Sequence, residues 1–382
     1  MKAKEGRHVA PASPSLLAKP DWPEARKRWA AYWEMRNTDR PLLAIAAPLA
    51  NRAARFAELV KPTDPEARYF DSEYISRYWL CCFETAYYGG ECFPSVIHLL
   101  ASYALGCRDA VRFDNASVWH NVTMKSMSEP LGWHPGPDDP WRHKLDKVMT
   151  RLLDLSPGRF FVGYQSQVMV NDLLTLIRGV DDFMADMGED AGLCARRVEE
   201  MFELWAETFD HYRAMVDARQ KEQGYVWANL WSPKFFMVTQ SDMSCMISPA
   251  MYEQYVVKEL EGVARRYSDT IWYHLDGPGA LKHLPSLLTK PYIRVIQWVP
   301  GAGQPDQGPD WIDVYRQVQD AGRGLDLYLR SPTAENIRIV EYLVRHLRPE
   351  GLVIRCSVDT REQADELIGM APGWCGSHLR TA

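Results

Sequence analysis

Short apolar runs alternate with longer stretches of helical hydrophobic spacing through the second half of this chain. Each run is rich in β-branched and aromatic residues and is bounded by Gly, Pro or polar residues, a pattern that predicts a buried strand. The predicted strands cover residues 158–164, 225–231, 271–276, 293–298, 325–329 and 352–356.

Amphipathic helices are predicted between these strands. Apolar residues recur at helical spacing over 198–216, after Ser248-Pro249, over 281–288, over 311–318 and from Ser331-Pro332 to Leu347. A serine followed by proline is typical of a helix start, and Thr360 with Gln363 forms a capping box for a last helix. The alternation therefore continues to the end of the chain.

Repeated strand–helix units with short connections predict a parallel sheet with right-handed crossovers. The number of units favours a closed (β/α)8 TIM-type barrel over an open sheet. The segment from about Asp21 to Asp154 is less regular and is interpreted as helices and loops that cover one end of the barrel. We expect a flexible N-terminal arm over residues 1–20 and a single barrel domain over residues 21–382.

Composition narrows the class of function. The 382 residues are 46% hydrophobic and 25% charged, as in ordinary globular enzymes, and the net charge of −6 comes without a basic stripe, which argues against nucleic acid as a partner. Eight scattered cysteines without a Cys-x-x-Cys pair indicate free thiols in a reducing compartment. With no membrane-length apolar run and no signal core, we expect a cytoplasmic protein.

The strand predicted over 271–276 ends in a histidine and a carboxylate, His274 and Asp276, followed at once by Gly277 and Pro278. Residues two apart on a strand face the same side, and the carboxyl end of a parallel strand is where barrel enzymes place their chemistry. His274 and Asp276 are thus a candidate metal or acid–base pair. The alternative, two residues that hydrogen-bond each other or a substrate without a metal, stays open.

Other polar and aromatic residues lie at predicted strand ends and would converge on the same barrel mouth. Asp242 joins them from the loop that precedes the Ser248-Pro249 helix. An aromatic wall for a flat or methylated substrate would be drawn from Trp227, Trp231, Trp272 and Trp298, with about half of these in the core. The candidate substrate-binding residues are Tyr88, Gln165, Trp231, Gln297, Trp298 and Tyr328.

Three segments resemble one known family. Residues 240–252 (QSDMSCMISPAMY), 273–277 (YHLDG) and 87–94 (YYGGECFP) are similar to the uroporphyrinogen decarboxylase superfamily. This superfamily also includes zinc-dependent methyltransferases that work with corrinoid proteins. The resemblance extends from about residue 25 to the C-terminus and implies a (β/α)8 barrel with additional N-terminal helices.

The resemblance disfavours porphyrinogen as the substrate. Decarboxylases of porphyrinogens carry an arginine-rich N-terminal segment that grips several carboxylates, whereas residues 39–48 (DRPLLAIAAP) contain only Arg40. The catalytic aspartate of that branch corresponds to Glu91, whose carboxylate is one methylene further from the backbone. Glu91 is therefore a candidate catalytic residue, together with Asp242 and His274.

The methyltransferase branch implies a zinc site. Its His-x-Cys motif with a distal cysteine matches His274 and Cys356, but Asp276 stands where the first cysteine is expected. The predicted ligand set is therefore Asp242, His274, Asp276 and Cys356, all of types that zinc accepts. Exchange of a thiolate for a carboxylate makes the metal a stronger Lewis acid and more tolerant of Mn or Fe.

Two enzymatic functions follow from this resemblance. The first is a metal-assisted methyltransferase or demethylase acting on a small methylated compound, with a separate corrinoid protein, a folate or a thiol as the methyl partner. The alternative is a metal-independent decarboxylase, a lyase of a small carboxylate, in which Glu91 or Asp242 stabilises a protonated intermediate. A ligand-binding barrel without catalysis and a homodimeric assembly are also compatible with the sequence.

Overall fold

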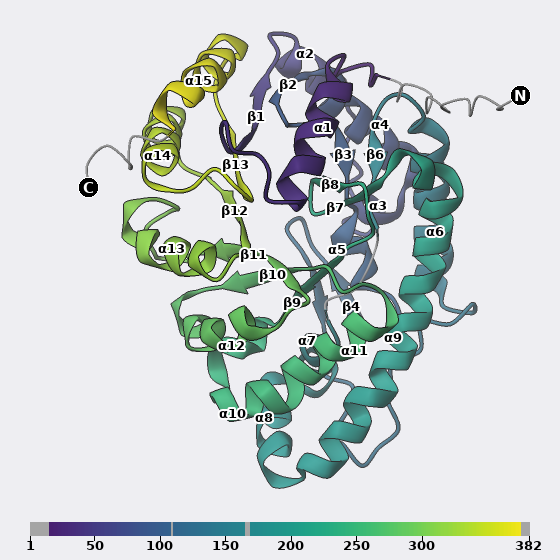
Figure 1. Ribbon diagram of the computed structural model, residues 1–382. Helices are drawn as coiled ribbons and strands as arrows, with labels where there is room; N and C mark the ends of the chain where they lie inside the picture. The colour runs from purple at the N-terminus through teal and green to yellow at the C-terminus, as the bar shows by residue number, and fades with distance from the viewer. Residues whose placement is uncertain (1–14, 108–109, 165–168, 376–382) are drawn as a thin grey trace, which may run out of the picture.

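The computed structural model describes residues 15–107, 110–164 and 169–375. Its centre is a seven-stranded sheet in the order β2-β1-β13-β12-β11-β10-β9 (Figure 1). All neighbours are parallel except β2, which pairs antiparallel with β1 at one edge. The strands are β1(Leu42–Pro48), β2(Ala86–Gly90), β9(Met237–Gln240), β10(Ile271–Asp276), β11(Ile293–Val299), β12(Gly324–Tyr328) and β13(Leu352–Ser357).

The last four strands confirm the sequence prediction closely. Each is apolar and buried along most of its length and is followed by a helix, after a short connection for β10, β12 and β13 and after a longer loop over residues 300–311 for β11. These helices are α12(Leu284–Thr289), α13(Ile312–Asp320), α14(Thr333–His346) and α15(Arg361–Trp374). The capping box at Thr360 and Gln363 is present at the start of α15. Local patterns were sufficient here because each strand is buried on both faces.

The N-terminal segment contains more than the helices and loops predicted for it. Helices α1(Trp22–Trp33), α4(Ser72–Glu84) and α6(Pro140–Leu155) are present, but β1 is an interior strand of the sheet, hydrogen-bonded to β13 and β2. Its run of small and apolar residues between Pro41 and Pro48 is the signal that the prediction passed over. Residues 15–20, predicted to belong to a flexible arm, also pack against the fold. Leu16 is buried, and Lys19 Nζ donates a hydrogen bond to the Tyr88 carbonyl of β2.

A second correction concerns residues 225–231, predicted as one strand. They form most of an antiparallel hairpin, β7(Tyr225–Trp227) and β8(Leu230–Ser232), because Ala228 and Asn229 turn the chain with positive φ values of 51° and 60°. The parallel partner of β10 is instead the short strand β9, whose sequence MVTQ has only two apolar residues.

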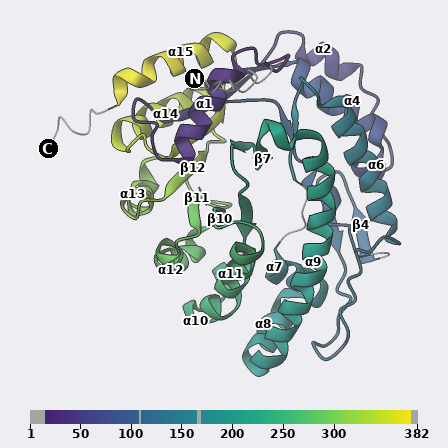
Figure 2. The same ribbon diagram turned by 45° about the vertical axis from the view of Figure 1, so that its right-hand side comes forward.

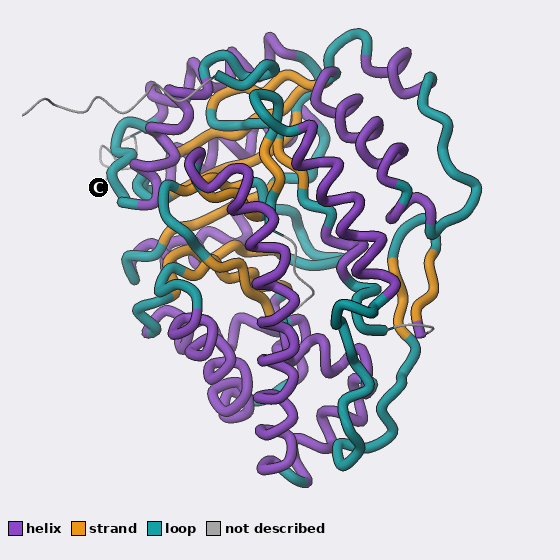
Figure 3. Tube along the Cα trace, turned by 90° about the vertical axis from the view of Figure 1, so that its right-hand side faces the viewer, coloured by secondary structure: helices purple, strands orange, loops and turns teal. Residues whose placement is uncertain are grey.

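Helices cover one side of the sheet. Figure 2 shows α11 to α15 following one another along this side of the strands, with α4, α6 and α9 across the molecule from them, and Figure 3 shows the strands gathered in the upper part of the molecule. The remaining elements are α2(Arg52–Ala57), α3(Ala67–Phe70), α5(Leu99–Ser102), α7(Val170–Arg178), α8(Val180–Glu189), α9(Ala191–Gln220), α10(Pro249–Met251), the π-helical turn Tyr252–Val257, α11(Lys258–Arg266), β3(Ser95–Val96), β4(Val111–Phe113), β5(Val118–His120) and β6(Phe161–Val162).

The predicted barrel is therefore confirmed at a coarser level, as a mixed α/β fold with a mostly parallel central sheet. Strands β3 and β6 form a separate parallel pair, and the ladders between described residues do not join this pair to the edge strands β2 and β9. Among the described helices, none is long and apolar enough to cross a membrane.

Candidate metal centre and adjoining cavities

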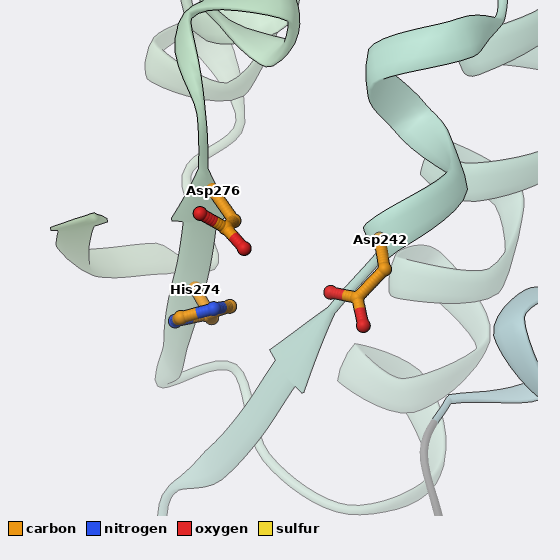
Figure 4. Close-up of side chains that lie close together, drawn as sticks. All are labelled: Asp242, His274 and Asp276. Atoms are coloured by element: carbon orange, nitrogen blue, oxygen red, sulfur yellow. The ribbon is translucent and has the colours of Figure 1, made fainter. Parts of the chain in front are cut away.

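Three of the four predicted metal ligands come together at the carboxyl end of the sheet. Asp242, His274 and Asp276 each offer one ligand atom, and these atoms all lie within 4.8 Å of one another. Strand β10 supplies His274 and Asp276 on one face, two residues apart, as predicted. The neighbouring strand β9 delivers Asp242 at the start of the 3₁₀ segment η3(Asp242–Met246), and Figure 4 shows its carboxylate directed toward β10.

The imidazole of His274 is oriented by a residue on the adjacent strand. Gln297 lies beside His274 in the register of β10 and β11, and its Oε1 is 2.5 Å from His274 Nδ1. With Gln297 Oε1 as the acceptor, Nδ1 carries the proton and Nε2 keeps its lone pair. That lone pair is the one a metal ion requires, so Gln297 acts as a partner that orients a ligand rather than as a contact for substrate alone.

The backbone at Asp242 is held by Asp172, a residue that the sequence prediction missed. Asp172 is buried in the first turn of α7 and accepts hydrogen bonds from the backbone N–H groups of Asp242 and Met243, at 2.9 and 3.2 Å. Gln240 Nε2 donates to Asp242 Oδ2 at 3.1 Å. Nothing local in the sequence marks Asp172, because its partners are about 70 residues away.

The electrostatics of the group suit a cation. Desolvation raises the pKa of Asp242, the nearby charge of Asp276 raises it further, and His274 lowers it. Burial likewise raises the pKa of Asp172 to about 7, with a further contribution from Asp242. Two carboxylates that disfavour each other's charge beside an imidazole lone pair are relieved by a divalent ion, and oxygen with imidazole nitrogen is a donor set used by Zn, Mn and Fe. The residues present therefore fit such a metal.

Cys356, the fourth predicted ligand, lies apart from this group. The sheet order places β11 and β12 between β10 and β13, so the strands of His274 and Cys356 are roughly 14 Å apart along the sheet. Cys356 is buried, and desolvation raises its thiol pKa to about 12, so the thiol is neutral. This distance removes Cys356 from the predicted ligand set and leaves three residues. The sequence could not predict the distance, because it does not show which strands lie between β10 and β13.

A large inner cavity opens beneath the group. It has a volume of about 830 Å³, and His274, Gln297 and Gln240 line it on the side of the candidate ligands. Aromatic and apolar side chains form much of the remaining wall. They include Trp79, Phe83, Tyr88, Phe93, Ile97, Tyr103, Met169, Trp227, Val238, Trp272 and Tyr328, and Cys356 lies among them.

The predicted substrate-binding residues divide between cavity and core. Tyr88, Gln297 and Tyr328 line the inner cavity. Trp231 does not, because its indole is buried against Trp22 and its Nε1 donates to the Gln223 carbonyl. Trp298 is likewise fully buried, with its ring 5.1 Å from that of Trp311. Of the four tryptophans considered for an aromatic wall, Trp227 and Trp272 thus line the cavity, and Gln165 lies outside the described residues.

The cavity floor carries a buried ion pair that the prediction did not include. Arg355 on β13 lines the cavity and bonds both oxygens of Asp326 on β12, at 2.8 Å each. Trp272 Nε1 donates to the same carboxylate at 3.0 Å. Arg355 therefore brings a guanidinium group to the cavity with its charge already balanced by Asp326.

Glu91, the predicted catalytic carboxylate, does not line the inner cavity. It is buried near the start of β1, where it accepts hydrogen bonds from two nitrogens of Arg40 and from the Leu43 backbone N–H, and it lies 2.9 Å from Arg28 Nε. Three partners satisfy its charge. Glu91 thus ties α1 and β1 together, and we leave it out of the candidate site.

A second, outer cavity of about 520 Å³ also adjoins the group. It is lined by the segments that follow β11 and β12, together with His274, Asp276 and Tyr328. His274 and Tyr328 line both cavities, so the candidate metal centre lies where the two cavities meet.

Comparison with known proteins shows the fold but not the family. No protein-family model matches the sequence, and no curated protein matches it. Among solved structures, the chain is similar to a methyltransferase from Methanosarcina mazei, with a TM-score of 0.59 and 12% sequence identity over 91% of this chain and 98% of that one. At this identity the likeness shows a shared α/β architecture over almost the whole of both chains.

Proposed function

We propose that this protein is a metal-assisted methyltransferase or demethylase that acts on a small methylated compound held in the inner cavity. The observation that carries the proposal is the group of Asp242, His274 and Asp276 at the edge of an aromatic cavity. The likeness in fold to a protein named a methyltransferase supports it. A barrel of the uroporphyrinogen decarboxylase superfamily, predicted from the sequence, is part of the same proposal.

The residues of this chain would divide the work. Asp242, His274 and Asp276 would hold the divalent cation, zinc in the first instance, which supplies Lewis acidity and lowers the pKa of a bound thiol or hydroxyl. Gln297 keeps the Nε2 lone pair of His274 available, and Asp172 holds the backbone that carries Asp242. Trp227 and Trp272 line the cavity and would contact a methylated or cationic group there.

The methyl partner in this proposal is a separate corrinoid protein, a folate or a thiol. Access to the candidate centre from two cavities supports two ligands that meet there, since each cavity includes His274 in its lining. Methyl transfer requires such an encounter between donor and acceptor.

A metal-independent decarboxylase is the second candidate function. The raised pKa of Asp242 favours it, because desolvation makes this carboxyl group a better proton carrier than an ordinary aspartate, as an acid that protonates a carbanion-like intermediate must be. Glu91 no longer contributes to this alternative, since its charge is satisfied by Arg28 and Arg40. Asp242 alone would then carry the acid–base role.

Metal analysis separates the two functions. We expect the purified protein, reloaded with zinc, to bind one ion per chain by elemental analysis, and His274→Ala to lose it. Cys356→Ser is the matched control and should retain the metal, because Cys356 lies outside the group. A protein that excludes zinc, manganese and iron and still decarboxylates a small acid would overturn the methyltransferase proposal.

A further inference from the structure

The outer cavity has a polar lining that contrasts with the aromatic inner one. Its lining includes Gly301, Gln304, Asp306, Arg330 and Ser331, from the segments after β11 and β12. His274 and Asp276 reach the same cavity from β10. A molecule bound there would have one end beside the candidate metal ligands and the other among these loops.

Two arginines beside Tyr328, one in the lining of each cavity, differ in their ion pairing. The ring of Tyr328 lies under both guanidinium groups, with Arg355 at 5.3 Å and Arg330 at 5.4 Å from its centroid. Arg355 is buried and neutralised by Asp326, whereas Arg330 is exposed and forms no ion pair with the residues that the structure describes. The guanidinium group of Arg355 is therefore already paired, whereas that of Arg330, which lines the outer cavity together with Asp276 and Asp306, has no ion-pair partner among the described residues and can bind an anion.

Asp306, a carboxylate in the same lining, is already engaged by other groups. Asp306 Oδ2 accepts from the Arg330 backbone N–H at 3.0 Å and from Ser331 Oγ at 2.7 Å, while Oδ1 accepts from the Gln307 N–H. These bonds fix the loop that carries Arg330 and occupy the acid that could compete for its side chain. Helix α14 begins three residues after Arg330, at Thr333, without a side-chain cap, and the positive end of its dipole adds to the field.

We propose that the outer cavity is a binding site for a small carboxylate-bearing molecule, with its carboxylate on the guanidinium group of Arg330 and its other end at His274 and Asp276. A planar guanidinium pairs a carboxylate through two parallel bonds. The carboxylate of Asp276 repels an acid at the opposite end and so orients the ligand. We assign this molecule as the second substrate of methyl transfer, and only that assignment rests on the proposed function.

Ligand binding to the full chain tests the site directly. Butyrate and butyramide share a shape and differ in charge, so their affinities can be compared by saturation-transfer NMR in zinc-loaded and metal-free protein. We expect butyrate to bind more tightly than butyramide, and Arg330→Gln to weaken butyrate by about 10- to 100-fold with no effect on butyramide. The butyrate affinity of Arg330→Lys should fall between those of the wild type and Arg330→Gln, since lysine keeps the positive charge but cannot form two parallel hydrogen bonds to a carboxylate.

Arg316→Gln is the control for loss of one positive charge, because Arg316 is exposed on α13 and lines neither cavity. It should bind butyrate like the wild type. Equal butyrate binding by wild type and Arg330→Gln overturns the site, as does an Arg316→Gln effect of the same size. Arg330-dependent binding in a protein that takes up no metal would support the site while the proposed function fails. Metal uptake with no effect of Arg330→Gln on butyrate binding would support the proposed function and overturn the carboxylate site.

Discussion

At the scale of single residues, the candidate centre depends on partners that sit one strand or one helix away. His274 owes its orientation to Gln297 on β11, and Asp242 owes its backbone position to Asp172 on α7. Asp276 extends the group toward the outer cavity. The chemistry of the site is therefore a property of pairs of residues and not of the three ligands alone.

Gln297→Leu tests the role of this partner. The substitution removes the acceptor of the Nδ1 proton, so the imidazole can rotate or change tautomer, and we expect zinc affinity to fall by about 10- to 100-fold. Competition with a chromophoric chelator measures the change. Gln319→Leu is a control, since Gln319 is also buried but bonds the Arg348 backbone far from the centre. Unaltered zinc affinity in Gln297→Leu would show that the hydrogen bond does not matter.

At the scale of elements, α7 is fixed by a carboxylate from α11. Glu259 is buried and accepts from the backbone N–H groups of Val170 and Asn171, the first two residues of α7, whose own start has no side-chain cap. Because α7 also carries Asp172, this contact helps to set the position of Asp242. Desolvation outweighs the hydrogen bonds and raises the pKa of Glu259 to about 7, from an ordinary value of 4.5.

The raised pKa of Glu259 predicts a pH dependence of stability. Between about pH 4.5 and 7 the folded chain keeps a proton that the unfolded chain has lost, so the contribution of Glu259 to stability falls as pH rises and levels off above pH 7. The loss amounts to about 3 kcal/mol. Glu259→Gln removes this pH-dependent contribution. Measured by urea unfolding, the free energy of unfolding of the variant should therefore rise relative to that of the wild type from pH 5 to pH 8.

Glu253→Gln provides the comparison for this measurement. Hydrogen bonding to Ser286 and the charge of Lys290 lower the pKa of Glu253 from 4.5, so its titration lies below the pH range tested. The stability difference between this variant and the wild type should stay flat from pH 5 to pH 8. A flat difference for Glu259→Gln as well would contradict the predicted role of its buried carboxyl group.

At the scale of the whole molecule, the sheet edge unites segments far apart in the chain. The candidate centre joins Asp242, which follows β9, to residues of β10 and β11. The inner cavity adds β1, β2, β12 and β13, and the outer cavity adds the loops after β11 and β12. A ligand bound at this junction contacts many elements only when all of them are folded. Binding should therefore stabilise the chain as a unit.

Thermal unfolding with and without metal tests this coupling. A ligand at 100 times its dissociation constant adds about 2.7 kcal/mol to the free energy of unfolding, so zinc should raise the melting temperature of the wild type and EDTA should reverse the increase. Asp242→Asn/Asp276→Asn should melt at the same temperature in either condition. The idea fails if this double variant responds to zinc as the wild type does.

The sequence by itself determined the last four strand–helix units and named all three candidate ligands, Asp242, His274 and Asp276. Strands β10 to β13 and the α15 capping box could be predicted because buried strands and helix caps leave their signal within a few consecutive residues. His274 and Asp276 could be paired for the same reason, since alternation along one strand puts them on one face.

Only the tertiary structure decided which distant residues meet. Two strands lie between Cys356 and His274, Trp231 and Trp298 are buried in the core, and Glu91 forms an ion pair with Arg40. The tertiary structure also placed Asp172 behind Asp242 and brought Arg330 to the outer cavity. Sheet order and packing are set by the burial of the whole chain, which acts over tens to hundreds of residues and leaves no mark in any short segment.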